Sequence, residues 1–331
     1  MNPARTISIG VLAYPGCLPS SATIPLDVLR IANAIAALRP SSLRVRFEGR
    51  LVSARGARPI TAGGLSFNPA SLARTDTDAL IVPSIDHRGA ADIATVLATL
   101  EREREALIEY AAGGRLLASA CSGACVAASA GLLDGRRCTT SWWLAPWFLQ
   151  RFPMALLDAE HMLVRDGGLL SSGGVSSSLD LALWLVGHFG GEELRQLSAR
   201  MLATDPNRTS QSPFVASAMV EGEGETVERA RDWIRQRIGR PWSVAQLARH
   251  CGVTPRTLLR RFQEALRLTP SGYAQQLRVE RARELLETTS LAVGEVARRA
   301  GYDTQAAFSR TFKRWTQATP AEYRRRFGLR H

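Results

Sequence analysis

The sequence predicts two folds in one chain: an α/β domain with a doubly wound parallel sheet, then an all-α domain with two helix-turn-helix units. Three observations predict this organisation. Short apolar stretches alternate with helical stretches over residues 1–200, which is typical of a parallel sheet. A helix–turn–helix pattern occurs twice near the C-terminus. The charge divides in the same way, because residues 229–331 hold 22 Lys and Arg against 8 Asp and Glu.

The charge asymmetry points to a polyanion as partner of the final third. Its net charge is +14, whereas residues 1–228 hold 20 Lys and Arg against 22 Asp and Glu, a net −2. No apolar run approaches the ~18 residues of a membrane span. The five cysteines are irregularly spaced and show neither a zinc pattern nor a disulfide framework. We therefore expect a cytoplasmic chain with no membrane span, no metal and no cofactor.

The N-terminal elements follow from local patterns. The predicted strands are Ile7–Tyr14, Arg44–Ser53, Ala79–Pro83 and Arg115–Ala120. The predicted helices are Pro25–Ala37, Ala91–Ala112 and one that starts near Leu179. We expect this domain to span residues 1–204. Residues 205–225 are rich in Pro and Gly and predict a linker, and residues 226–331 form the second domain.

A cysteine stands where one strand meets a helix. Arg115–Ala120 runs directly into Cys121, and a helix is expected over Ser122–Ala130. A nucleophile on a tight turn between strand and helix has the geometry of a nucleophile elbow, and Gly123 leaves room for close packing. The alternative is a buried structural cysteine at a strand end.

Residues 7–190 resemble the PfpI-like branch of the class I glutamine amidotransferase-like fold, which implies a flavodoxin-like sheet. The resemblance rests on the segments 24–30, 120–124, 130–135, 139–142 and 171–176. Active members of that family need a carboxylate and a histidine near the elbow cysteine. Ser21, Ser122 and Ser141 stand at the corresponding positions here. His87, His161 and His188 are isolated in the sequence.

Nucleophilic catalysis requires a base within hydrogen-bond reach, and the expected positions supply none. The sequence therefore predicts a ligand pocket and no enzyme, with these candidates: Ser21, Cys121, Ser122, Ser141, Trp142 and Gly173. Trp142, Trp143 and Trp147 could hold a quaternary ammonium group by cation–π contacts, or pack in the core. The alternative function is a cysteine-dependent hydrolase or glyoxalase-type activity at Cys121, tethered to a DNA-binding domain.

The first helix-turn-helix unit is expected at about 243–266. Ser243 and Gln246 form a capping-box pattern. Thr254 is expected to cap the second helix, with Pro255 at its first position. Leu258, Phe262 and Leu266 then face inward.

The second unit is expected at about 292–316. Gly301 corresponds to Gly252 at an offset of 49 residues, and Phe312 to Phe262 at an offset of 50. Asp303 is expected to cap its second helix. A long helix over Tyr273–Thr288 would join the two units and let both recognition helices reach successive major grooves.

Residues 230–327 resemble the AraC/XylS family of transcription regulators. The second unit carries the family signature from Val296 to Arg324, including Gly301, Phe308 and Pro320. Arg267 and Gln317 replace the glycine that usually ends each recognition helix. If these positions are left-handed, each replacement costs about 1 kcal/mol.

The residues expected to face DNA are those on the outer side of the two recognition helices. They are Arg256, Thr257, Leu259, Arg260, Arg261, Thr304, Gln305, Ala306, Ser309, Arg310, Lys313 and Arg314.

The two resemblances together imply a sequence-specific transcription regulator, with an activator expected. The implied effectors are amino-acid-like or quaternary amine metabolites, such as arginine, carnitine or glycine betaine. We expect four partners: double-stranded promoter DNA, the small-molecule effector, a second copy of the chain and RNA polymerase. A constitutive regulator whose N-terminal domain only dimerises is a further alternative.

Overall fold

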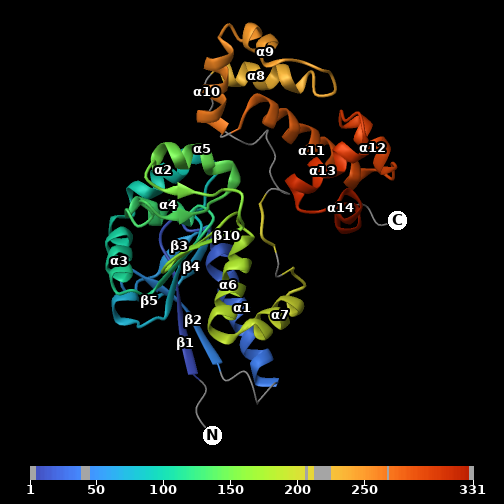
Figure 1. Ribbon diagram of the computed structural model, residues 1–331. Coiled ribbons are helices and arrows are strands. Elements are labelled where there is room, and N and C mark those ends of the chain that lie inside the picture. The colour runs from blue at the N-terminus through green and yellow to red at the C-terminus, as the bar shows by residue number, and fades with distance from the viewer. Residues whose placement is uncertain (1–4, 39–44, 206–207, 212–224, 267, 328–331) are drawn as a thin grey trace. The chain divides into compact units, whose positions relative to one another are not determined.

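The computed structural model describes residues 5–38, 45–205, 208–211, 225–266 and 268–327. The chain divides into two compact units, Met1–Gln211 and Ser212–His331. Figure 1 shows an α/β first unit and an all-helical second unit.

The first unit is built on a seven-stranded sheet. Its strands are β1 (Arg5–Leu12), β2 (Val45–Ser53), β5 (Ala70–Ser71), β6 (Ala79–Val82), β7 (Leu116–Ala120), β10 (Leu163–Asp166) and β11 (Leu169–Ser172). They lie in the order β10-β11-β7-β6-β1-β2-β5. Neighbours are parallel except β10 and β11. The central order β2-β1-β6-β7-β11 is the flavodoxin-like arrangement, which confirms the predicted fold class.

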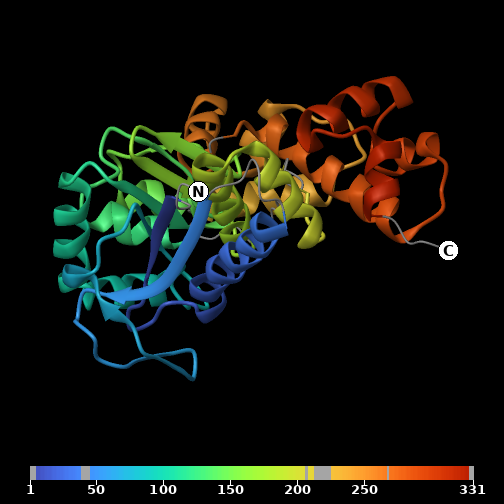
Figure 2. The same cartoon turned by 90° about the horizontal axis from the view of Figure 1, so that it is seen from below.

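Helices cover both faces of this sheet, so its strands are apolar on both sides. One face carries α1 (Pro19–Leu38), α6 (Ser177–Gly190) and α7 (Glu192–Met201). The other carries α2 (Ala90–Ala98), α3 (Glu101–Ala112), α4 (Gly123–Ser129) and α5 (Ala145–Arg151). Along β6, Leu80 and Val82 enter one core while Ala79 and Ile81 enter the other. In Figure 2, α1 runs beside β1 and β2.

Two short strand pairs and two 3₁₀ helices complete the described part of the first unit. The strands β3 (Ile60–Ala62) and β4 (Leu65–Phe67) form a short hairpin, and β8 (Arg137–Cys138) pairs with β9 (Leu156–Leu157). Two single turns, Leu72–Arg74 and Trp142–Leu144, are 3₁₀ helices.

The predicted helix 91–112 is wrong in one respect, because the structure divides it into α2 and α3. Two arginines stabilise the break. Arg55 Nη2 donates to the carbonyl oxygen of Thr99 at 2.9 Å, and Arg104 Nη1 donates to that of Leu97 at 2.8 Å. These carbonyl groups lie where the regular helical hydrogen-bond pattern is interrupted, and the guanidinium groups donate to them there.

The sequence predicts that the first helix begins at Pro25, whereas α1 begins at Pro19. Ser21 in its first turn accepts the backbone N–H of Ser84 at 2.9 Å, a tertiary contact that no local pattern reveals. Among the described helices, α1 alone is long and apolar enough to cross a membrane by length and composition. Its apolar residues Val28, Leu29 and Ala32 are buried in the core between α1 and the sheet, which accounts for this composition.

The start of the expected linker belongs to the first unit. Residues Arg208–Gln211 lie against residues 160–162, and Met162 donates its N–H to the carbonyl oxygen of Thr209 at 2.8 Å. This part of the linker prediction is wrong because these backbone groups pair with the first unit. Residues 206–207 and 212–224 of that segment lie outside the described residues.

The second unit contains seven described helices. They are α8 (Glu225–Arg235), α9 (Val244–His250), α10 (Pro255–Leu266), α11 (Pro270–Thr288), α12 (Val293–Arg299), α13 (Gln305–Thr316) and α14 (Pro320–Phe327). They form two apolar cores. Helix α11 enters both, with Tyr273 and Leu277 in the first and Ala282 and Leu286 in the second. The long helix predicted between the two helix-turn-helix units is confirmed as α11, which begins at Pro270, three residues before the predicted start.

Candidate nucleic-acid interface and ligand site

The first helix-turn-helix consists of α9 and α10. Ser243 and Gln246 form the predicted capping box, and Gly252 takes a positive φ of 69° at the turn. Thr254 accepts the backbone N–H of Thr257 at 3.2 Å, so it caps α10 as expected. Leu258 and Phe262 are fully buried. Their spacing fixes which face of α10 points away from the core.

The second helix-turn-helix consists of α12 and α13 and repeats this arrangement. Phe308 and Phe312 are fully buried, and Gly301 has φ of 85°. The predicted cap is wrong. Thr304, not Asp303, accepts the backbone N–H of Ala307 at 3.2 Å, because the helix starts at Gln305 and places Thr304 at the capping position.

Most residues expected to face DNA lie on exposed surface. The exposed ones are Arg256, Leu259, Arg260, Thr304, Gln305, Ala306, Arg310, Lys313 and Arg314, whereas Thr257 and Ser309 are partly exposed. Arginines of both recognition helices also make contacts within the second unit. Arg261 hydrogen-bonds the hydroxyl of Thr226 on α8, and Arg314 Nη2 donates to Gln275 Oε1 on α11 at 3.1 Å. Arg261 therefore ties α10 to α8.

The end of α13 shows the left-handed position anticipated from the missing glycine. Gln317 has φ of 59°, and its N–H donates to the carbonyl oxygen of Lys313 at 2.9 Å. A side chain at this conformation is strained relative to glycine. The corresponding Arg267 lies outside the described residues.

The elbow at Cys121 has the predicted geometry. Its φ is 53°, a left-handed conformation between the end of β7 and the start of α4. A Cβ on Gly123 would lie 2.5 Å from the carbonyl oxygens of Val82 and Pro83, so only glycine fits there. The turn therefore depends on a strained cysteine and a glycine in close contact with β6.

The serines near the elbow form buried hydrogen bonds. Cys121 Sγ lies 2.8 Å from Ser141 Oγ, and the thiol is 1% exposed. Ser122 Oγ accepts the N–H of Ile85 at 3.0 Å. Ser21 Oγ lies 2.9 Å from Ser178 Oγ and accepts the N–H of Ser84. Four of the predicted pocket residues thus hydrogen-bond one another, Ser178 or the backbone that follows β6.

The three histidines considered in the sequence make specific contacts. His161 Nδ1 lies 2.9 Å from Asp158 Oδ1. Although partial burial acts to raise it, these contacts with His161 lower the pKa of Asp158 below its usual range. Burial lowers the pKa of His87, whose ring lies 5.1 Å from that of Trp143. His188 stacks on Trp184 at 4.8 Å.

The three tryptophans divide between two roles. Trp143 and Trp147 pack against the apolar core beside α4 and α5. Trp142 is half-buried, and its backbone N–H donates to Gln211 Oε1 at 3.2 Å. Only Trp142 of the three thus meets the polar groups near Gly173.

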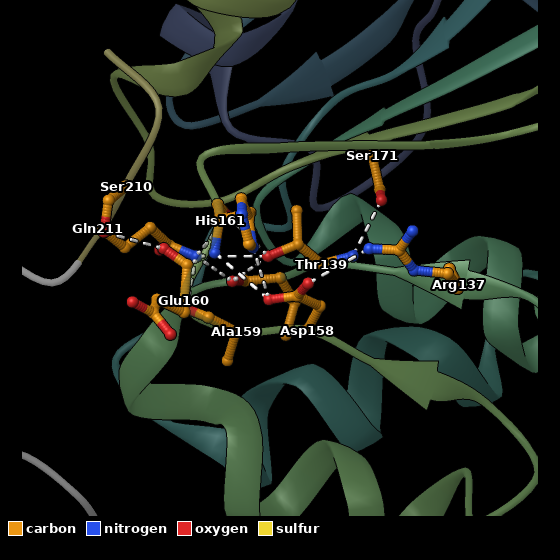
Figure 3. A network of polar contacts seen from close by, with 10 residues as sticks. Arg137, Thr139, Asp158, Ala159, Glu160, His161, Ser171, Ser210 and Gln211 are labelled. Atoms are coloured by element: carbon orange, nitrogen blue, oxygen red, sulfur yellow. Dashed lines mark hydrogen bonds and ion pairs between the residues drawn. The ribbon is translucent and has the colours of Figure 1, made fainter.

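Sequence reasoning missed Gln211, which lies among the predicted pocket residues. Its side chain occupies the space over Gly173, where an added Cβ would lie 2.1 Å from the Gln211 amide. Gln211 is 1% exposed. Figure 3 shows its side chain directed into a cluster of backbone carbonyl groups. No local signal marks this residue, because it stands in a Pro-rich segment typical of a linker.

Two surface hollows lie away from the elbow. One, of about 890 Å³, is lined by residues of α1 and β2, including Asp27, Arg30 and Arg50. The other, of about 870 Å³, lies at the amino ends of the strands, near Ser8, Asp78 and Arg115. Ligands of open α/β sheets bind at the carboxyl ends of the strands, where Cys121 lies, so we place the candidate ligand site at the elbow.

Comparison with known proteins connects both units to one kind of protein. A helix-turn-helix domain family model matches residues 247–326. The HTH-type transcriptional regulator GbdR of Pseudomonas aeruginosa is 27% identical over 320 residues, covering 96% of this chain and 84% of GbdR. The HTH-type transcriptional regulator GlxA of Rhizobium meliloti is 32% identical over 222 residues, 62% of this chain and 64% of GlxA. The similarity to GbdR includes the α/β unit.

The second unit carries a helix-turn-helix domain of the AraC-family kind, and the chain as a whole is similar to HTH-type transcriptional regulators. It is a DNA-binding regulator whose first unit has a flavodoxin-like α/β fold.

Solved structures resemble mainly the regulator's first unit. An AraC family transcriptional regulator from Pseudomonas putida is 22% identical, covering 59% of this chain and 99% of that one, with a TM-score of 0.44. Drosophila melanogaster DJ-1beta is 21% identical, covering 60% of this chain and 99% of that one, with a TM-score of 0.48. The fold of the regulator's first unit rests on its own sheet order.

Proposed function

We propose that this regulator is a cytoplasmic homodimer that activates transcription when a small metabolite binds its α/β domain. In this proposal residues 1–204 bind the effector and dimerise, and residues 226–331 read the promoter and contact RNA polymerase. The observation that carries the proposal is a pair of helix-turn-helix units, each exposing arginine on its second helix: Arg256 and Arg260 on α10, and Arg310 on α13.

Arginine suits both guanine edges and phosphates, since its planar fork donates two parallel hydrogen bonds. Helix α11 is shared by the two cores, so it holds both recognition helices in one rigid body. We infer that the two helices enter successive major grooves about 34 Å apart. An effector would then act by differential affinity for two arrangements of these modules.

Substitution of the exposed arginines tests the DNA contact. Arg260→Ala and Arg310→Ala should each weaken specific operator binding by about 1–3 kcal/mol, measured by footprinting and fluorescence anisotropy. The matched control is Arg281→Ala, because Arg281 is also exposed but pairs with Glu284 on α11. Unchanged operator footprints in both recognition-helix variants would refute the assignment.

The effector site is proposed at the elbow, with Cys121 and Trp142 among its residues and an amino-acid-like or quaternary amine metabolite as ligand. The proposal includes no catalysis. The described hydrogen bond of the Cys121 thiol goes to the Ser141 hydroxyl, which is not a general base at neutral pH.

A thermal-shift screen of amino acids and quaternary amines on the full chain tests the sensor. A binding metabolite should raise the unfolding temperature and change operator affinity. The Cys121→Ala variant should still bind the operator, and we expect no enzymatic turnover that depends on the Cys121 thiol. Turnover of a metabolite that disappears in Cys121→Ala would instead establish an enzyme.

A further inference from the structure

The side chain of Gln211 occupies a site built for N–H donors. Its Nε2 lies 2.9 Å from the carbonyl oxygen of Thr140, 3.0 Å from that of Ala159 and 3.3 Å from that of His161. The hydroxyl of Thr139 lies 3.2 Å away. Four oxygen acceptors thus surround one NH₂ group that carries two hydrogens (Figure 3).

The opposite side of the same amide meets a donor. The backbone N–H of Trp142 donates to Gln211 Oε1 at 3.2 Å, directly after Ser141, the partner of the Cys121 thiol. The site therefore joins the elbow through consecutive residues. It selects a planar group with an NH₂ edge and one oxygen, and a quaternary ammonium has no N–H to offer these acceptors.

A short backbone strap carries Gln211 to this site. The N–H of Gln211 donates to the carbonyl oxygen of Glu160 at 2.7 Å, and Met162 donates to Thr209 at 2.8 Å. Arg208 pairs with the buried carboxylate of Asp180 on α6. The strap Arg208–Gln211 is thus held at both ends, and the second unit begins at the next residue, Ser212.

We propose that Gln211 is a built-in occupant of the effector site, and that a ligand with a primary carboxamide head group binds by displacing it. Displacement releases the strap Arg208–Gln211, which ends the first unit. This inference rests on the proposed effector function and narrows its ligand class. It also gives the regulator a two-state element whose equilibrium the ligand shifts.

The occupied state lowers the apparent affinity for any competing ligand, because only the fraction of molecules with an open site binds it. Removal of the glutamine side chain should therefore tighten binding, by about tenfold if the open fraction is about one tenth. Two variants serve. Gln211→Ala empties the site, and Gln211→Glu replaces the NH₂ with an oxygen that the four acceptors repel.

Hydrogen exchange of the full chain tests the occupancy. In both variants the backbone amides of residues 160–162 and 208–211 should exchange at least tenfold faster than in the unchanged protein. Propionamide, which carries the same primary carboxamide as glutamine, should restore protection in Gln211→Ala, whereas propionate should not. Gln196→Ala is the matched control, since Gln196 lies in the same unit and bonds Glu192 on its own helix.

Unchanged exchange in both variants would overturn the proposal, as would equal protection by propionamide and propionate. The effector function has a separate readout, the operator affinity measured with and without propionamide in Gln211→Ala. Selective protection by propionamide with unaltered operator affinity would retain the site and refute its role in sensing.

Discussion

At position 121 the backbone takes a left-handed φ of 53°, a conformation that non-glycine residues rarely adopt. The neighbours enforce it: the Cys121 N–H donates to the carbonyl oxygen of Ser172 at 2.7 Å, and Thr140 Oγ1 donates to the Cys121 carbonyl oxygen at 2.9 Å. The strain at the elbow thus persists in a site whose expected carboxylate and histidine positions are serines. This retained strain supports the proposal that the elbow binds a ligand.

Substitution of Gly123 should destabilise the first unit. Gly123→Ala places a Cβ 2.5 Å from the carbonyl oxygens of Val82 and Pro83, and such overpacking costs about 1–3 kcal/mol. Gly168→Ala is the control, because its Cβ would lie 3.6 Å from the Arg115 carbonyl oxygen, an ordinary contact. Urea unfolding of both variants measures the difference, and equal midpoints would show that the close approach is relieved at no cost.

Among the helices, the two recognition helices share one design but differ in their ends. Both begin after a capping threonine, Thr254 or Thr304, and both bury a phenylalanine at the centre, Phe262 or Phe312. The one described recognition-helix C-terminus, at Gln317, is left-handed. Substitutions at the N-terminus and at the C-terminus of α13 therefore measure what each end contributes to the free energy of unfolding.

The N-terminus of α13 distinguishes two neighbouring residues. Thr304→Ala should destabilise the second unit by about 1 kcal/mol, since it removes the side chain that accepts the Ala307 N–H. Asp303→Ala should leave the free energy of unfolding within about 0.5 kcal/mol. Chemical denaturation of the full chain checks both, and a larger loss at Asp303 would restore the cap that the sequence predicts.

The C-terminus of α13 offers a stabilising change. Gln317→Gly removes the left-handed strain and should raise the free energy of unfolding by up to about 1 kcal/mol. Gln263→Gly, on the exposed face of α10, should instead lower it by about 1 kcal/mol, because glycine is a poor helix former. Opposite shifts in the denaturation midpoint are the expected result, and shifts of the same sign would contradict it.

On the scale of the whole molecule, charge and chemistry are segregated. Residues 229–331 carry a net +14 and residues 1–228 a net −2, so the electrostatic attraction to DNA resides in the second unit. The first unit contributes a polar site at the carboxyl edge of its sheet.

Salt dependence should report this segregation. Lys313→Gln should reduce the magnitude of the slope of log K against log salt by about 1, because one phosphate contact is lost. Arg30→Gln is the control, since Arg30 is an exposed cation of the first unit, paired with Asp27. Operator titrations at several salt concentrations measure both slopes, and an equal reduction in the two variants would contradict the assignment.

The sequence by itself determined both folds, the two helix-turn-helix units and the elbow at Cys121. These follow from periodicity, capping residues and glycine positions, which act over a few residues. Tertiary structure decided the division of the helix at Thr99, the use of Ser21 and Ser122 as buried partners, and the place of Gln211. Gln211 bonds groups 50 to 72 positions away. Such contacts form only after the sheet has brought distant carbonyl groups together, so no local pattern of residues encodes them.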